Sequence, residues 1–242
     1  MNKKNKIFLS IAVLLMALGI VAFSFHSNRF DNRILSYTVD PKIQEVKLYW
    51  KDEKGKPFQS IQNLKDHLES QNKNLLFAMN GGMYLPDGSP QGLFIHEHKT
   101  LTQIDTTSGN GNFYMKPNGI FYLMADNAPH VCATSDFLYN DQIKYATQSG
   151  PMLIINGQIH PAFQKGSPNL KIRNGVGILP NNQILFAISK TEINLYDFAE
   201  FFLKQGCKNA LYLDGVVSRA YYPKGKWIQT DGQFGVMIGV TD

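Results

Sequence analysis

The sequence predicts an α+β fold: a mixed, largely antiparallel β-sheet with two βαβ units and few flanking helices. Three observations lead to this prediction. Short apolar or alternating runs separated by turn residues recur from residue 43 onward and are typical of strands. Only about two or three segments have a helical period. A strand–helix–strand order occurs twice, once in each half of the chain.

The first strand–helix–strand unit begins with IQEVKLYW, residues 43–50. This run alternates between apolar and polar side chains, as a half-buried strand does. The apolar residues of segment 60–71 share one helical face, behind a suitable N-cap at Ser60. The continuous apolar run LLFAM, residues 75–79, completes the unit as a buried strand.

The middle of the chain is predicted to consist of hairpins. We expect strands around GLFIH, NFYMK and GIFYLM, with the last two joined by a turn at Pro117-Asn118-Gly119. PMLIINGQIH is expected to turn on Asn156-Gly157, and VGIL to pair with ILFAIS across NNQ. Short connections of this kind favour antiparallel neighbours.

The second strand–helix–strand unit consists of a strand at 183–188, a helix at 194–205 and a strand at 210–213. Asn194 is a suitable helix N-cap, and Gly206 ends the helix. If both units are right-handed crossovers, the second strand of each runs parallel to its first.

Each unit ends in a short polar turn that contains glycine: MNGGMY at 79–84 and LDGVVS at 213–218. Ligands of open α/β sheets bind outside the carboxyl ends of such strands. This places Asn80 and Asp214 at the rim of a pocket. One hypothesis is that both residues line the same pocket. The alternative is two turns without a common site.

Asp214 carries a charge at the tip of a short apolar strand. A buried, unpaired carboxylate is costly, so it needs partners or must face a cleft. Because Asp-Gly is also a common turn pair, a purely structural turn is the alternative.

Two further stretches carry polar groups beside apolar strands. Ser149-Gly150 precedes one strand and Arg173 precedes another. Arginine is suited to a two-point grip on phosphate or carboxylate, although a surface ion pair is the commoner role. Gly81, Gly82 and Gly150 would let backbone N–H groups approach an anion closely.

Residues 1–28 are predicted to be a membrane anchor or signal segment rather than part of the fold. The uncharged run 7–25 follows three lysines and is long enough to cross a bilayer as a helix. We favour an uncleaved anchor over a signal cleaved after Ser24, because cleavable signals usually have shorter apolar regions. The lysines favour a cytoplasmic N-terminus, so both alternatives export the domain 29–242 to the periplasmic or extracellular side.

The composition limits the classes of protein and of binding partner that remain. With 242 residues, 43% of them hydrophobic and 18% charged, the chain is globular rather than disordered. Its net charge of +5 comes without a basic cluster interleaved with aromatic residues, so we expect no nucleic-acid partner. Cys132 and Cys207 permit one disulfide in an oxidising compartment, but two buried free thiols are the favoured interpretation.

HEH at His96–His98 is the pattern closest to a metal site. His96 and His98 would share one face of a strand. A solvated turn is the commoner source of such a pattern, and Lys99 favours it. We therefore expect neither a metal site nor a cofactor.

Five motifs in series make the chain resemble a known family. They are NGGMY, SPQGLFI, SGPMLIINGQI, RNGVGILPNNQILFAIS and GCKNALYLDGVVSRAYYP. Their order and spacing are similar to those of the phosphodiester glycosidase domain. This is the family of N-acetylglucosamine-1-phosphodiester alpha-N-acetylglucosaminidase, the "uncovering enzyme", whose bacterial members are often called exopolysaccharide-related proteins.

The resemblance implies an exported hydrolase that cleaves the bond between a sugar anomeric carbon and phosphate. The substrate would be a sugar-1-phosphodiester of an envelope or extracellular glycan. Asp214 would activate water or trap the sugar cation, as base or as nucleophile, and Arg173 would stabilise phosphate charge. Asn80, Ser149 and Ser218 would hold the sugar. A second carboxylate has three candidates: Asp87, Glu97 and Glu192.

The chain departs from the family pattern at Val216 and Val217, where many members have two glycines. Two β-branched residues stiffen that turn and hinder close backbone approach, so the substrate is expected to differ from that of the glycine-rich members. The alternative functions are a non-catalytic phosphoglycan-binding protein and a structural envelope protein on the same fold.

Overall fold

The computed structural model describes residues 31–215 and 217–242 of the chain. A compact unit extends from Arg33 to Asp242. The expected membrane anchor or signal segment lies outside the described residues. Among the residues that are described, no helix has both the length and the apolar character needed to cross a bilayer.

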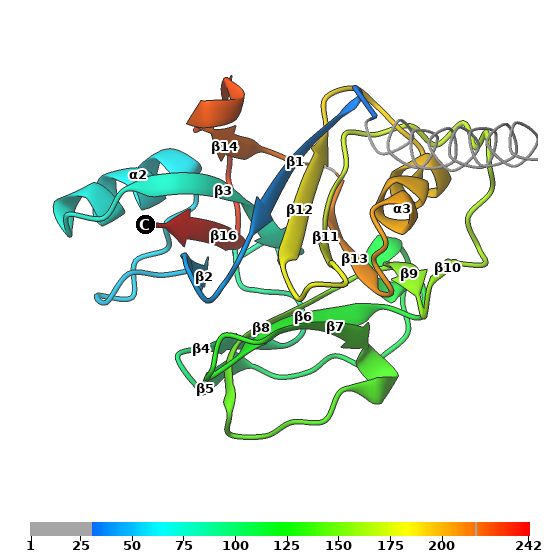
Figure 1. Ribbon diagram of the computed structural model, residues 1–242. Coiled ribbons are helices and arrows are strands. Elements are labelled where there is room, and N and C mark those ends of the chain that lie inside the picture. The colour runs from blue at the N-terminus through cyan, green and yellow to red at the C-terminus, as the bar shows by residue number, and fades with distance from the viewer. Residues whose placement is uncertain (1–30, 216) are drawn as a thin grey trace, which may run out of the picture. The chain divides into compact units, whose positions relative to one another are not determined.

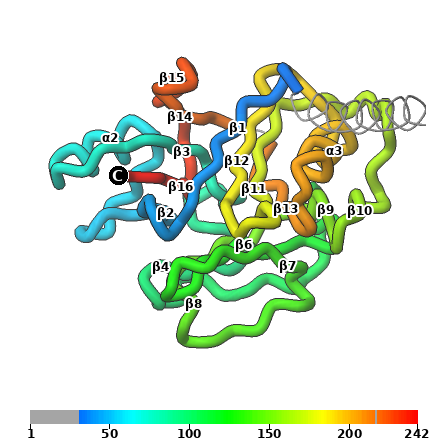
Figure 2. The backbone as a smooth tube through the Cα atoms, viewed as in Figure 1, coloured from blue at the N-terminus to red at the C-terminus, as the bar shows by residue number. Residues whose placement is uncertain are grey.

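Three antiparallel sheets build this unit (Figures 1 and 2). The six-stranded sheet has the order β1 (Ile34–Val39), β12 (Ile184–Ser189), β11 (Asn174–Ile178), β13 (Ala210–Asp214), β9 (Met152–Ile155) and β10 (Gln158–Ile159). It contains two of the expected hairpins, β9–β10 and β11–β12. Asn156 and Gly157 both have positive φ, as a two-residue turn between antiparallel strands requires.

The second sheet is five-stranded. Its order is β15 (Trp227–Ile228), β14 (Ala220–Tyr222), β3 (Leu75–Gly82), β16 (Val236–Thr241) and β2 (Glu45–Tyr49). Strand β16 comes from the C-terminal end of the chain and pairs with β3 on one side and β2 on the other. The sheet therefore joins strands that are almost 200 residues apart, as the pairing of Thr241 with Glu45 shows.

The third sheet is also five-stranded. Its order is β5 (Lys99–Thr102), β4 (Phe94–His96), β8 (Ile143–Ser149), β6 (Gly119–Met124) and β7 (Pro129–Ala133). Three short 3-10 helices lie in the connections of the fold: η1 (Asn112–Tyr114), η2 (Thr134–Asp136) and η3 (Pro223–Gly225).

The two helices of the described chain begin as expected from the sequence. Ser60 caps α2 (Ile61–Ser70) by accepting a bond from the Asn63 amide. Asn194 caps α3 (Leu195–Lys204) by accepting one from the Asp197 amide. Each cap satisfies an N–H group that the first helical turn leaves without a partner. The fold is thus mostly antiparallel sheet with few helices, as predicted.

Both strand–helix–strand units are present, and each contains an inserted strand. β2 and β3 are both antiparallel to β16, so they run parallel to each other with β16 between them. β12 and β13 are related in the same way through β11. The inserted strands make every pairing among the described strands antiparallel while the two strands of each unit stay parallel.

One apolar core receives side chains from all three sheets, among them Leu48, Phe77, Phe121 and Phe186. Two smaller clusters lie beneath the helices, one under α3 and one under α2. Cys207 belongs to the cluster under α3, and both cysteines are free thiols. Burial raises the pKa of Cys132 to about 11 and that of Cys207 to about 12, so both stay protonated near neutral pH.

The expected hairpin at Pro117-Asn118-Gly119 is wrong. NFYMK forms the 3-10 helix η1 instead of a strand, and Gly119 is already the first residue of β6. Gly119 is not among the residues with positive φ, so it does not make the turn. A Cβ there would lie 2.3 Å from the Met152 sulfur, so the glycine allows close packing between sheets.

The expected turn at NGGMY begins later than the sequence suggests, because β3 continues through Gly82. A Cβ at Gly81 would lie 2.8 Å from Ile238, and one at Gly82 would lie 2.6 Å from Thr147. The two glycines thus let β3 pack closely against β16 and β8. Asn80 is consequently a buried strand residue.

Candidate active site

The candidate site lies where β13 and β3 come together. All five residues of β13 are buried, and its last residue, Asp214, is 6% exposed. The Gly215 amide, which follows, donates to Asp214 Oδ1 at 2.5 Å. A Cβ on Gly215 would lie 1.5 Å from the Tyr212 hydroxyl oxygen, so only glycine fits after this carboxylate.

Asn174 on β11 joins the ends of the two strands. Its Nδ2 donates to the Asn80 backbone carbonyl at 2.8 Å and to Asn80 Oδ1 at 2.9 Å. Its Oδ1 accepts from the Asp214 amide at 2.8 Å. All three residues are buried, so these bonds are shielded from competing water. Asn80 and Asp214 therefore belong to one hydrogen-bonded cluster, joined through Asn174.

The predicted serines hold the backbone on either side of Asp214. Ser149 Oγ, at the end of β8, donates to the Leu213 carbonyl at 2.8 Å. Ser218 Oγ donates to the Asp214 carbonyl at 2.9 Å. Both hydroxyl groups are thus engaged within the protein. Their contact with a substrate stays a prediction.

Arg173 is fully buried and bonded at each of its three nitrogens. Nε donates to the Ile193 carbonyl at 2.7 Å, Nη1 to the Tyr212 hydroxyl at 3.1 Å and Nη2 to the Asn169 carbonyl at 2.8 Å. These contacts tie the segment before β11 to the loop before α3. The guanidinium is therefore part of the structural framework of the site.

Tyr212 connects the two predicted catalytic residues. Burial raises its pKa to about 12; the Arg173 charge opposes this shift and the Asp214 carboxylate adds to it. Both charges therefore act on the same hydroxyl group, which carries its proton at neutral pH. The Tyr212 hydroxyl thus links Arg173 to the strand that ends in Asp214.

Asp214 faces an open pocket of about 390 Å³. Its polar lining comes from Asp214, Tyr84, Gln91 and Asn112, and its apolar lining from Met83, Leu85, Pro86 and Val217. The pKa of Tyr84 is raised by burial and then by the Asp214 charge, which indicates that the phenol lies near the carboxylate. Amide, phenol and carboxylate groups over apolar walls suit a hydroxyl-rich ligand.

The predicted residues share a cluster but not a single open cleft. Arg173 lines a separate pocket of about 160 Å³ with Asn169, Ser167 and Tyr196. Asn80, Ser149 and Ser218 line neither pocket. A Cβ on Gly150 would lie 2.6 Å from that of Asn118, so Gly150, like Gly81 and Gly82, approaches protein atoms. Backbone approach by these glycines to a ligand stays a prediction.

The three candidates for a second carboxylate lie in different places. Asp87 belongs to the exposed turn that follows Leu85 and Pro86, where its Oδ1 accepts from the Ser89 amide and hydroxyl. Glu97 lines a different pocket, and Glu192 is exposed on the surface. Asp87 is thus the candidate whose loop borders the Asp214 pocket.

Sequence reasoning missed Asn174, Tyr212, Tyr84 and Asn112. Asn174 directly follows Arg173, and Tyr212 lies two residues before Asp214. Neither residue carries a motif of its own, and the role of each depends on hydrogen bonds to residues far away in the sequence. Tyr84 offered a signal, because it ends the NGGMY motif.

A model of the phosphodiester glycosidase family matches residues 73–240, which include β3, β11 and β13. The chain belongs to the phosphodiester glycosidase family. The chain is also 36% identical over 208 residues to "Uncharacterized protein YigE" of Escherichia coli (strain K12), covering 86% of this chain and 81% of the relative.

Solved structures share the fold of this chain. The catalytic domain of zebrafish N-acetylglucosamine-1-phosphodiester alpha-N-acetylglucosaminidase, auto-inhibited by its pro-peptide, has a TM-score of 0.59 at 15% identity. That match covers 86% of this chain and 82% of the zebrafish chain. A putative exported protein from Burkholderia pseudomallei K96243 has a TM-score of 0.56 at 10% identity, over 86% of this chain and 74% of its own.

Family membership and fold agree with the resemblance that the five motifs predicted. They support a hydrolase that acts on a phosphodiester glycan.

Proposed function

We propose that this phosphodiester glycosidase is an exported enzyme that cleaves the bond between a sugar anomeric carbon and phosphate. Its substrate is a sugar-1-phosphodiester in an envelope or extracellular glycan. The observation that carries this proposal is Asp214, a carboxylate at the tip of a buried strand that faces a pocket within the matched family region.

Asp214 has the position that such a reaction needs. Water adds across the bond, so that a hydroxyl group ends on the anomeric carbon and the phosphate leaves as a monoester. A phosphomonoester is a much weaker base than a sugar hydroxyl, so a strong general acid is less needed than in ordinary glycoside hydrolysis. One carboxylate, acting as base or nucleophile, can then be the central catalytic group.

The other polar groups have supporting roles in this proposal. Tyr84, Gln91 and Asn112 line the pocket and can hold sugar hydroxyls. Arg173 places a positive charge beside Tyr212, whose hydroxyl oxygen accepts from its Nη1, and it does not line the Asp214 pocket. It lowers the energy of a developing phosphate charge through the field of a poorly screened site rather than by direct contact.

The proposal is tested by hydrolysis of UDP-N-acetylglucosamine by the full-length protein in water labelled with ¹⁸O. Cleavage at the anomeric carbon releases free N-acetylglucosamine that carries the label, together with unlabelled UDP. Label in the phosphate product, or release of sugar 1-phosphate, would mean that a phosphorus–oxygen bond breaks and would contradict the proposal.

An envelope sugar-phosphate polymer is the second substrate for the same assay. Release of sugar from the polymer but not from the nucleotide would narrow the substrate to glycans. Binding without release from either would favour the non-catalytic alternative, a phosphoglycan-binding protein.

The exported location is part of this proposal and has its own test. The test uses a reporter that is active only outside the cytoplasm, fused after Asp242. We expect this fusion to be active. The same fusion carrying acidic residues in place of Lys3, Lys4 and Lys6 should lose that orientation, because flanking positive charge sets it. Activity of a reporter that works only in the cytoplasm would contradict export.

A further inference from the structure

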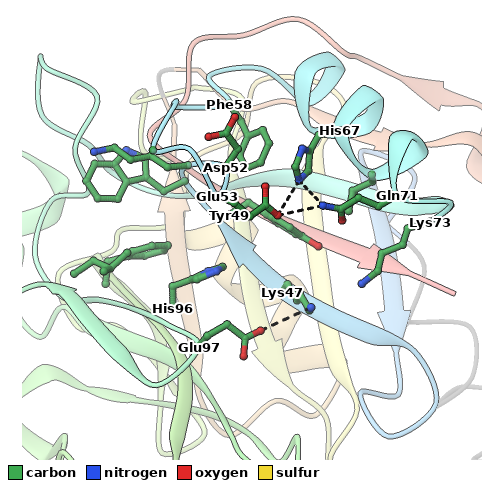
Figure 3. Close-up of a pocket in the computed structure, with 16 residues that line it drawn as sticks. Lys47, Tyr49, Asp52, Glu53, Phe58, His67, Gln71, Lys73, His96 and Glu97 are labelled. Carbon is green, nitrogen blue, oxygen red and sulfur yellow. Dashed lines mark hydrogen bonds and ion pairs between the residues drawn. The ribbon is translucent and has the colours of Figure 1, made fainter.

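A second and larger pocket of about 540 Å³ lies between the end of β2, helix α2 and the β4–β5 hairpin (Figure 3). None of its lining residues lines the Asp214 pocket. The proposed reaction at Asp214 therefore does not account for this second pocket.

The walls of this second pocket are aromatic. Tyr49 meets Phe58 edge to face at 6.1 Å between ring centroids, and Trp50 meets Phe94 in the same way at 6.1 Å. The Nζ of Lys51 lies 3.8 Å from the centroid of the Trp50 ring. A flexible lysine thus covers a face on which a flat ligand could stack once the lysine moves.

The Trp50 side chain also carries an unused donor. Its Nε1 is buried and has no hydrogen-bond partner within the described part of the chain. A buried N–H without a partner costs about 1–3 kcal/mol, so its retention needs a reason. The atom is closed to solvent in this structure, so an acceptor on a bound ligand would reach it only after a neighbouring side chain such as Lys51 moves.

The rim of the pocket carries side chains of both signs. Glu53 lies 3.5 Å from the ring of His67 and accepts from Gln71 at 3.1 Å (Figure 3). Across the pocket Lys47 lies 3.7 Å from Glu97. The lining contains three lysines and three acidic residues: Lys47, Lys51, Lys73, Asp52, Glu53 and Glu97. This balance favours neither a phosphate nor a cation.

Glu97 is held at this rim by the two-residue turn of the β4–β5 hairpin, in which His96 pairs with Lys99. Glu97 has a φ of +46° and His98 a φ of +66°, as such a turn between antiparallel strands requires. The Glu97 carboxylate accepts a bond from the Tyr145 hydroxyl. The HEH motif is thus a tight turn that presents a carboxylate.

We propose that this second pocket binds a neutral sugar residue. A sugar ring has an apolar face for the aromatic walls, many hydroxyl groups for a rim of mixed charge, and an acceptor for the Trp50 indole. Carboxylate, amide and lysine groups around aromatic rings match this combination better than they match a purely apolar or a charged ligand.

Trp50 allows a direct test, because the chain has only two tryptophans. Trp227→Phe leaves Trp50 as the single tryptophan, which is excited selectively at the red edge of the absorption band; Trp227 lies on β15 and outside this pocket. The full-length Trp227→Phe protein is titrated with chitotetraose, cellotetraose and maltotetraose. We expect a saturable change in Trp50 fluorescence with at least one of them.

Two further variants in the Trp227→Phe background locate the binding. Glu97→Gln should raise the Kd about tenfold, because hydrogen bonds to a carboxylate contribute more than those to an amide. Asp214→Asn should leave the Kd unchanged, since the two pockets share no residue. Glu192→Gln, at an exposed carboxylate elsewhere, is the matched control for Glu97→Gln.

Three outcomes would overturn the proposal. The first is no saturable change with any of the three saccharides while the melting curve stays that of the wild type. The second is saturation by choline chloride alone, which would indicate a cation site. The third is binding that Asp214→Asn abolishes and Glu97→Gln leaves intact, which would place the sugar in the other pocket.

Discussion

The two strand–helix–strand units share their architecture but end in different chemistry. In each, one antiparallel strand separates two parallel strands: β16 in the first unit and β11 in the second. β3 contributes a neutral amide, Asn80, and continues through two glycines. β13 ends in the carboxylate of Asp214 and turns at once. The repeated architecture brings two strand ends together, and only one of them carries charge.

Asn174 connects the neutral end of the first unit to the charged end of the second. It lies on the inserted strand of the second unit and binds the end of each. The first unit thus helps to orient the site, whereas the second supplies the carboxylate of the proposed reaction. Substitutions in each unit should therefore separate activity from stability.

The largest effect is expected from removing the charge of the second unit. Asp214→Asn keeps the side-chain shape but removes basicity, so the rate of sugar release should fall at least about a hundredfold. Its melting temperature should stay close to that of the wild type. Steady-state hydrolysis and thermal unfolding measured together test this, with Asp231→Asn, an exposed carboxylate, as control. Undiminished turnover in a folded Asp214→Asn protein removes Asp214 from the mechanism.

Arg173→Lys should reduce stability as well as activity. A lysine keeps the charge but cannot bond Ile193, Asn169 and Tyr212 together, so buried acceptors lose partners. We expect a loss of about 2 kcal/mol or more in the free energy of unfolding. Arg219→Lys is the matched control, because Arg219 forms an exposed pair with Asp231. Equal unfolding free energies for the two variants would argue against a framework role for Arg173.

Asn174→Ala should remove the hydrogen bonds that join the ends of the two units. It leaves the Asp214 amide and the Asn80 carbonyl without their partner, at a cost of about 1–3 kcal/mol. Asn181→Ala, which loses only exposed bonds to Gln183, should stay within about 0.5 kcal/mol of the wild type. Urea unfolding measures both. A change confined to activity would mean that Asn174 positions Asp214 without stabilising the fold.

The smallest expected effect is on the pH dependence of stability, through Glu45 in the first unit. Burial alone would raise the pKa of Glu45, but bonds from Lys73 and Lys47 lower it to about 2. Because the folded value lies below the ordinary one of 4.5, the carboxylate stabilises the protein above about pH 4.5. This contribution is lost as the pH falls toward 2, and solvent screening keeps it below about 1 kcal/mol. Melting curves of wild type and Glu45→Gln should therefore differ at neutral pH and converge in acid.

Local signals allowed much of the fold to be predicted. Ser60, Asn194 and Gly206 mark helix ends through backbone chemistry that involves only nearby residues. Asn156-Gly157 likewise specifies its own turn. These features depend on a few neighbours along the chain, so the sequence alone is sufficient to predict them.

Features that depend on distant partners could not be predicted in this way. Gly81, Gly82 and Gly119 look like turn residues, but they serve close packing against other strands. Asn174 gains its role only when β11 lies beside β13 and near β3. The family resemblance led to Asp214 and Asn80, whereas the hydrogen bonds that join them through Asn174 required the structure.

The position of β16 has a consequence for how this protein is made. The place between β2 and β3 in the second sheet is filled by residues 236–241, which are synthesised long after both of those strands. Until then β2 and β3 lack the strand that separates them, and the core beneath them stays open. A chain without residues 236–241 would lose the strand that joins β2 to β3 in that sheet.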